Sequence, residues 1–121
     1  MEQILVALAG VMGAAGIMLT AAGAHSKPGV GLDSAGYLLV LHAIAVIAGV
    51  LADRQGLILR PLGLVVVWGF VVGAALFAAD VTVRAYVGTR LFPFAAPTGG
   101  MIMILSWIAL IPAALMASRA G

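Results

Sequence analysis

Four long stretches of the chain contain almost only apolar side chains, and short polar segments separate them. They cover residues 4–24, 35–52, 62–79 and about 100–116. A helix rises about 1.5 Å per residue, so about 20 apolar residues cross the roughly 30 Å hydrocarbon core of a bilayer. Lipid offers the backbone no hydrogen bonds, and a helix pairs its own N–H and C=O groups. The pattern therefore predicts an all-α fold, an integral membrane bundle of four transmembrane helices forming a single domain over residues 1–121.

The polar segments predict where these helices begin and end. Asp33 or Ser34 is the expected N-cap of the second helix, and Thr98 is the expected N-cap of the fourth. Residues 81–98 mix arginines, aromatic residues and prolines. Aromatic and cationic side chains together are typical of the membrane–water interface. We therefore expect a helix end and a loop at headgroup level in this segment.

A row of small side chains follows one face of the first apolar stretch. Its members recur at steps of three and four, which keeps them on one side of a helix. Small residues let a neighbouring backbone approach closely inside a membrane. The second stretch has a small residue on the same face as His42, and the third contains a GxxxG motif. These patterns predict helix packing at Gly13, Gly16, Thr20, Gly23, Gly49, Gly69 and Gly73.

Composition supports a membrane protein and excludes several other classes. Of the 121 residues, 64 % are hydrophobic and 8 % are charged, and lipid solvates that much apolar surface better than water does. The absence of cysteine excludes disulfides, thiolate metal sites and cysteine nucleophiles. The six Lys and Arg residues are scattered singly, which is unlike a nucleic-acid-binding surface. The expected surroundings are membrane lipid.

The distribution of cations gives only a small preference for one orientation. Four spans place equal numbers on the two sides: Arg54, Arg60 and Arg119 on one, and Lys27, Arg84 and Arg90 on the other. The short connection that carries Arg54 and Arg60 has the denser charge, and dense charge favours the cytoplasm. For a bacterial source, the sequence thus predicts a multi-pass protein of the cytoplasmic (inner) membrane with both termini in the cytoplasm.

Polar residues gather at one predicted end of the bundle. The end of the first helix, the end of the third and the start of the fourth share one side of the membrane, and His42 lies deeper. We call this expected group the polar mouth, comprising His25, His42, Asp80, Arg84, Thr98, Gly99 and Gly100. Asp80 and Arg84 are spaced for an i,i+4 ion pair. The group is interpreted either as hydrogen-bonding staples between helices or as a site for a small molecule, an ion or a partner.

Cofactor and enzyme chemistry are disfavoured by the same residues. The set His25, His42 and Asp80 is incomplete for zinc. The small side chains of the first helix leave no obvious gap for haem between the histidines. No nucleophile with a neighbouring base is visible in the sequence. The sequence thus predicts no cofactor, no metal and no catalysis.

Several short motifs occur together in chain order. They are Gly23-Ala24-His25, Tyr37 followed by His42-Ala43, and the run from Ala96 to Gly100 followed by Trp107. In this order and spacing the chain resembles the family called "domain of unknown function 423", whose animal members are called transmembrane protein 256. The resemblance implies a four-helix membrane protein with no established activity. The chain departs from the family pattern in its short first connection, in Leu41 and in Asp80 and Arg84.

The expected function follows from the small faces and the few polar groups. A non-catalytic scaffold, accessory subunit or assembly partner needs exposed small-residue faces, and the first and third helices carry them. A homo-oligomer or a larger membrane complex is the expected assembly. The alternative is an oligomeric transporter or channel for a small molecule or ion, entered at the polar mouth. Transport requires an oligomer, because four short helices can hardly enclose a pore.

Overall fold

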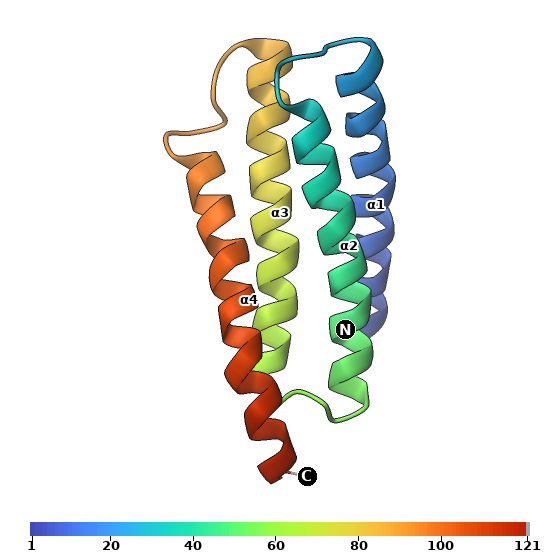
Figure 1. The fold of residues 1–121 in the computed structure, drawn as a ribbon, viewed down its shortest axis with the longest axis vertical. Coiled ribbons are helices and arrows are strands. Elements are labelled where there is room, and N and C mark those ends of the chain that lie inside the picture. The colour runs from blue at the N-terminus through green and yellow to red at the C-terminus, as the bar shows by residue number, and fades with distance from the viewer. Residues whose placement is uncertain (121) are drawn as a thin grey trace.

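The computed structural model describes the backbone of residues 1–120 and the side chains of residues 1–117. Its elements are α1 (Glu2–His25), α2 (Leu32–Arg54), α3 (Leu62–Val87) and α4 (Ala95–Ala120), which run alternately up and down (Figure 1). All four are long and apolar enough to cross a membrane, with mean hydropathies of 2.1 to 2.4. The described residues contain no strand. The prediction of an all-α, four-helix membrane protein is confirmed.

Two helix boundaries differ from the predicted ones near the third connection. α3 continues to Val87 rather than ending at residue 79, and α4 begins at Ala95 rather than at residue 100. Pro97 lies in the first turn of α4, where its missing N–H leaves no carbonyl unpaired. Thr98 is inside the helix and donates its backbone N–H to the carbonyl of Phe94 at 2.9 Å. The prediction of Thr98 as an N-cap is therefore wrong.

The start of α2 also differs from the prediction. The N-cap is Gly31, whose φ of 85° is a left-handed conformation that glycine adopts readily. Asp33 and Ser34, the predicted caps, lie inside the first turn. There the carboxylate of Asp33 faces the positive end of the helix dipole. The capping prediction is wrong because α2 starts at a glycine in a left-handed conformation, without a hydrogen bond from a side-chain cap.

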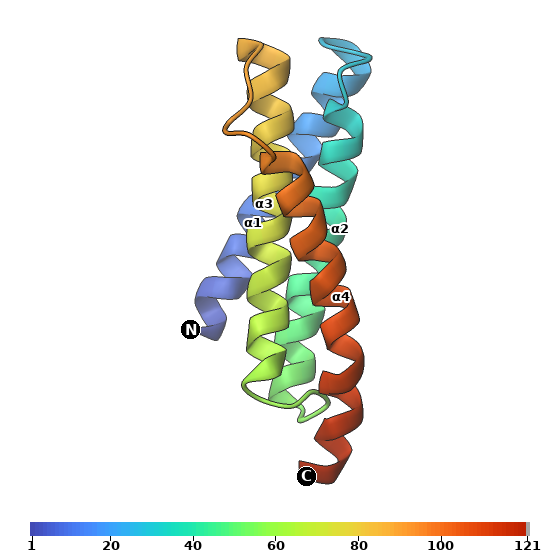
Figure 2. The same cartoon turned by 90° about the vertical axis from the view of Figure 1, so that its left-hand side faces the viewer.

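The helices form an open row rather than a closed ring. α1 packs mainly on α2, α2 on α3, and α3 on α4, whereas α1 and α4 make no direct backbone contact within the described residues. Figures 1 and 2 show α1 and α4 on opposite sides of the molecule. In α1 and α4, 22 % of the apolar window is buried, against 44 % in α2 and α3. The outer helices therefore present most of their surface to the surroundings.

The α1–α2 contact is built on glycine. A Cβ atom on Gly16 would lie 2.9 Å from the carbonyl oxygen of Gly36, and one on Gly36 would lie 2.7 Å from the backbone nitrogen of Thr20. Near the loop, a Cβ on Gly23 would lie 2.5 Å from the nitrogen of Asp33. Gly13 has ordinary space. The two backbones thus touch directly along this contact.

The α3–α4 contact repeats this arrangement. A Cβ on Gly73 would lie 2.9 Å from the carbonyl oxygen of Gly99, and one on Gly99 would lie 2.7 Å from the carbonyl oxygen of Gly73. Gly69 faces the side chain of Ser106. The central α2–α3 contact differs, because Gly49 there meets the side chain of Val67 rather than a backbone. The largest fully buried apolar residues are Leu5, Leu32, Val46, Val66, Val67 and Phe70.

Candidate functional site

The seven residues of the predicted polar mouth occupy separate places in the structure. Asp80, Arg84 and Gly100 line one cavity between α3 and α4. His42 is buried farther along the bundle, and His25 is exposed at the end of α1, on a groove between α1 and α2. Of the other two, Thr98 is exposed and Gly99 belongs to the α3–α4 contact. The structure thus brings the acidic and basic residues together, and it does not place either histidine with them.

His42 links three helices. It projects from the inward face of α2, is 2 % exposed, and packs edge-on against Phe70 of α3 and Trp107 of α4. The ring centroids are 5.5 Å and 5.9 Å away, respectively. Nδ1 of His42 lies 2.7 Å from the carbonyl oxygen of Leu38, and Nε2 lies 3.0 Å from Nε1 of Trp107. Both ring nitrogens are therefore engaged.

These partners determine the form of the imidazole. The indole nitrogen of Trp107 can only donate, so Nε2 of His42 accepts. The proton must then reside on Nδ1, which donates to the carbonyl of Leu38. A metal ion or a second proton at Nε2 would displace the Trp107 N–H. The geometry therefore supports a neutral His42 that joins α2 to α4.

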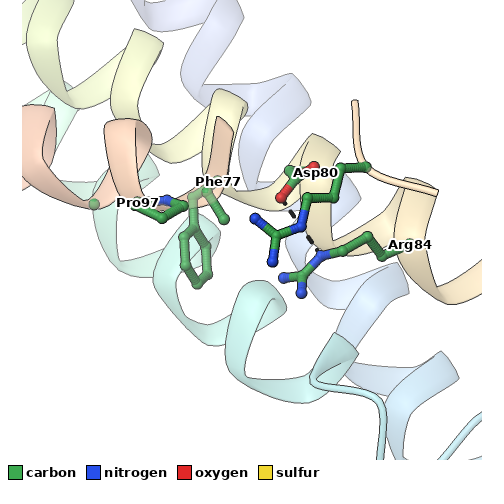
Figure 3. A pocket seen from close by; sticks show the side chains of 7 residues that line it. Phe77, Asp80, Arg84 and Pro97 are labelled. Atoms are coloured by element: carbon green, nitrogen blue, oxygen red, sulfur yellow. Dashed lines mark ion pairs between the residues drawn. The ribbon is translucent and has the colours of Figure 1, made fainter. Parts of the chain in front are cut away.

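Asp80 ties the third connection to α3. Its side chain is 1 % exposed, and its Oδ1 accepts the backbone N–H of Leu91 at 2.8 Å. Its Oδ2 lies 3.5 Å from Nε of Arg84, one turn farther along the helix. Figure 3 shows this ion pair beside Phe77 and Pro97. The cavity here has a volume of about 340 Å³ and is lined by Phe77, Asp80, Arg84, Arg90, Ala96, Pro97 and Gly100.

The opposite end of the bundle holds a second charged group, which the sequence analysis did not single out. Asp53 is buried, and its Oδ2 lies 2.6 Å from Nη2 and 2.8 Å from Nε of Arg60. The hydrogen bond and the negative charge of Asp53, with a smaller effect of Glu2, raise the pKa of Arg60 above its ordinary value. Glu2 also lies 3.7 Å from Arg54. The sequence contains a signal for this group, because the opposite charges of Asp53 and Arg60 flank the short connection between α2 and α3.

Arg119 was predicted on the same side as this group, but its side chain lies outside the described residues. Within the described part of the chain, no group of three or more His, Cys, Asp or Glu residues is arranged to hold a metal ion.

Comparison with protein-family models, with curated proteins and with solved structures found no match. The resemblance to the "domain of unknown function 423" family stays a prediction from the sequence motifs.

Proposed function

We propose that this chain is a non-catalytic membrane protein that acts as a scaffold, accessory subunit or assembly partner. The observation that carries the proposal is a groove of about 490 Å³ between α1 and α3. Its walls include several small side chains, among them Ala15, Ala75, Ala78, Ala79 and Thr82. Small side chains at a membrane-facing groove let another helix pack closely.

The open row of helices supports the same proposal. Within the described part of the chain, α1 packs along its length on α2 and touches α3 over a small area. Large apolar side chains of α1, such as Val11, Ile17 and Met18, are exposed. Lipid solvates them as well as protein does, so they add no preference by themselves. The alanine-lined groove beside them supplies the shape that a helix requires.

The polar groups of the interior favour a structural role over catalysis. His42 uses both ring nitrogens on Leu38 and Trp107. Asp80 holds Leu91 and Arg84. The imidazole of His42 and the carboxylate of Asp80 are thus engaged with other groups of the protein, which supports a structural role for these two side chains.

The alternative, an oligomeric transporter or channel, has less support. It requires His25, His42 and Asp80 to line one path, and these residues lie apart. We further propose that the chain is a multi-pass protein of the inner membrane with both termini in the cytoplasm, and that it does not bind nucleic acid.

In-cell photo-crosslinking tests the proposed assembly. A photoreactive amino acid replaces Met18, which lines the groove, or Ile104, an exposed residue of α4, as the matched control. We expect a discrete crosslinked band from position 18 and none from position 104. A band of twice the chain mass identifies a homo-oligomer, and another mass identifies a larger complex. The variant Ala79→Leu fills the groove and should abolish the band. Equal crosslinking from both positions, or no protein band at all, contradicts the proposal.

A further inference from the structure

The cavity between the end of α3 and the start of α4 carries an excess of positive charge. Its lining contains two guanidinium groups, Arg84 and Arg90, and one carboxylate, Asp80. Arg84 contacts Asp80 through Nε and keeps 43 % of its side chain exposed. Within the described residues, Arg90 has no ion-pair or hydrogen-bonding partner. One full positive charge is thus left without a protein partner.

Asp80 does not compete for that charge. Its two oxygens are directed to Leu91 and Arg84, and its side chain is almost completely buried. By holding Leu91, Asp80 keeps the neighbouring Arg90 next to the cavity. Because Asp80 contacts Arg84 through Nε, the outer nitrogens of that guanidinium remain available to a ligand. Figure 3 shows the Arg84 side chain extending across the site in the direction of Phe77.

The remaining wall suits a small amphipathic anion. Phe77, Ala96 and Pro97 supply apolar surface opposite the arginines. The volume of about 340 Å³ falls within the range of small-molecule sites, about 300–1,000 Å³. Ala96 belongs to the first turn of α4, and this end of the helix dipole carries partial positive charge. Charge, shape and helix orientation all favour the same kind of ligand.

The position of the cavity at the end of α3 fits the depth of lipid phosphates. α3 has 26 residues and is therefore about 39 Å long, which exceeds the roughly 30 Å hydrocarbon core. This length lets its last turns reach the headgroup region. Exposed Tyr86, Phe92 and Phe94 occupy the same end of the molecule, as is typical of the membrane–water interface. A basic cavity between helices at this depth is suited to an anionic headgroup.

We propose that this cavity binds the phosphate of a phosphoester, with Arg84 and Arg90 as its ligands. Guanidinium groups bind phosphate through paired, charge-assisted hydrogen bonds. Phe77 and Pro97 contact the carbon portion of the ester. The phosphate belongs either to an anionic lipid headgroup or to a water-soluble phosphoester, and the two sources share this chemistry. The site shares no lining residue with the α1–α3 groove, so a test of phosphate binding is independent of a test of the proposed assembly.

Native mass spectrometry of the full chain in neutral detergent tests the site. The probes are dioleoyl phosphatidylglycerol, dioleoyl phosphatidylcholine, glycerol 3-phosphate and inorganic phosphate. We expect one saturable adduct with phosphatidylglycerol or with the soluble phosphates, and much weaker binding of zwitterionic phosphatidylcholine. Displacement of the lipid by glycerol 3-phosphate identifies a soluble phosphoester as the ligand. Retention of the lipid identifies a headgroup site.

Matched arginine variants decide whether the cavity is responsible. Arg90→Gln should weaken phosphate binding about tenfold, the loss expected for one charge-assisted interaction. Arg90 has no partner to lose, so this variant should keep the wild-type unfolding temperature. Arg54→Gln, at the opposite end of the bundle, should change binding by less than about twofold. Unchanged binding by Arg90→Gln, equal losses in both variants, or equal binding of phosphatidylcholine would overturn the proposal.

Discussion

Trp107 of α4 donates its indole N–H to Nε2 of His42 on α2 over 3.0 Å, although these two helices make no direct backbone contact within the described residues. The two side chains therefore span a gap that the backbones leave open. Phe70 of α3 lies between them, with its ring 4.6 Å from that of Trp107. Four hydrogen-bonding atoms, including the Leu38 carbonyl, are mutually satisfied in an apolar environment. Such an arrangement is costly to interrupt at one end.

Replacing His42 by Ala should therefore destabilise the protein. The change leaves the indole N–H of Trp107 without its acceptor, and such losses cost about 1–3 kcal/mol. His42→Gln should recover much of this, because an amide can accept from Trp107 and donate to Leu38. Thermal unfolding in detergent measures both variants. A folded His42→Gln protein that lost a stoichiometric bound metal ion would contradict this structural role.

Trp107→Phe tests the same bond from the other side. It keeps an aromatic ring near Phe70 but removes the donor, so Nε2 of His42 is left unsatisfied at a cost of about 1–3 kcal/mol. In a double-mutant cycle with His42→Ala, which removes the acceptor, the two effects should not add. Strict additivity of the unfolding free energies would show that the two side chains do not interact.

The glycine contact between α1 and α2 predicts a graded series of alanine variants. Gly36→Ala places a Cβ 2.5 Å from the Gly16 carbonyl and should destabilise the protein by about 1–3 kcal/mol. Gly13→Ala meets only the Cβ of Ala43 at 3.9 Å and should be tolerated. Gly10→Ala is the control, because it faces open space and should stabilise the helix by roughly 0.5–1 kcal/mol. Unfolding temperatures that did not follow this order would refute the close approach.

Asp80 should contribute through two separable interactions. Asp80→Asn keeps an oxygen that can accept the Leu91 N–H but removes the charge facing Arg84. Asp80→Ala removes both interactions and strands the Leu91 N–H, so it should cost about 1–3 kcal/mol more than the asparagine variant. Hydrogen exchange at the Leu91 amide should accelerate strongly only in Asp80→Ala. Equal exchange in both variants would show that the carboxylate does not hold the loop.

The proposed orientation predicts the outcome of reporter fusions. A reporter after Gln55 should lie in the cytoplasm, because that connection carries Arg54 and Arg60, and one after Gly88 should lie on the other side. Alkaline phosphatase and a fluorescent protein give opposite signals on the two sides. Finding both positions on one side would contradict the four-span topology, and exchange of the two results would reverse the orientation alone.

Sequence reasoning located the four helices but not all of their ends. Lipid forces the backbone of an apolar stretch to pair with itself, so hydropathy alone indicates a helix there. At headgroup depth that constraint disappears, and the mixed residues between Val81 and Thr98 suit a helix or a loop equally well. The helical turns from Val81 to Val87 and the early start at Ala95 were missed for this reason.

Partners across helices were beyond the same reasoning. Periodicity places His42 on an inward face, but it does not say which residue of which helix lies opposite. Trp107 is 65 positions away, and its register against α2 depends on how α3 packs with both neighbours. Asp53 and Arg60 are closer in sequence, yet their pairing depends on the path of the connection. The sequence did predict that Asp80, Arg84 and Gly100 lie near one another. Helices that cross the membrane in alternating directions place the end of the third and the start of the fourth on the same side.

The two glycine contacts, α1 with α2 and α3 with α4, make the molecule a pair of tightly packed helical hairpins. Within each hairpin the two backbones touch directly, whereas at Gly49 the α2–α3 boundary is formed by the side chain of Val67. Inside a membrane an apolar boundary has little resistance to sliding, because lipid can replace either partner. The hydrogen bond between His42 and Trp107 crosses that boundary and resists sliding of one helical hairpin against the other. When the molecule is pulled apart from its ends, the hairpins should separate whole, and they should do so at lower force once the indole donor is gone.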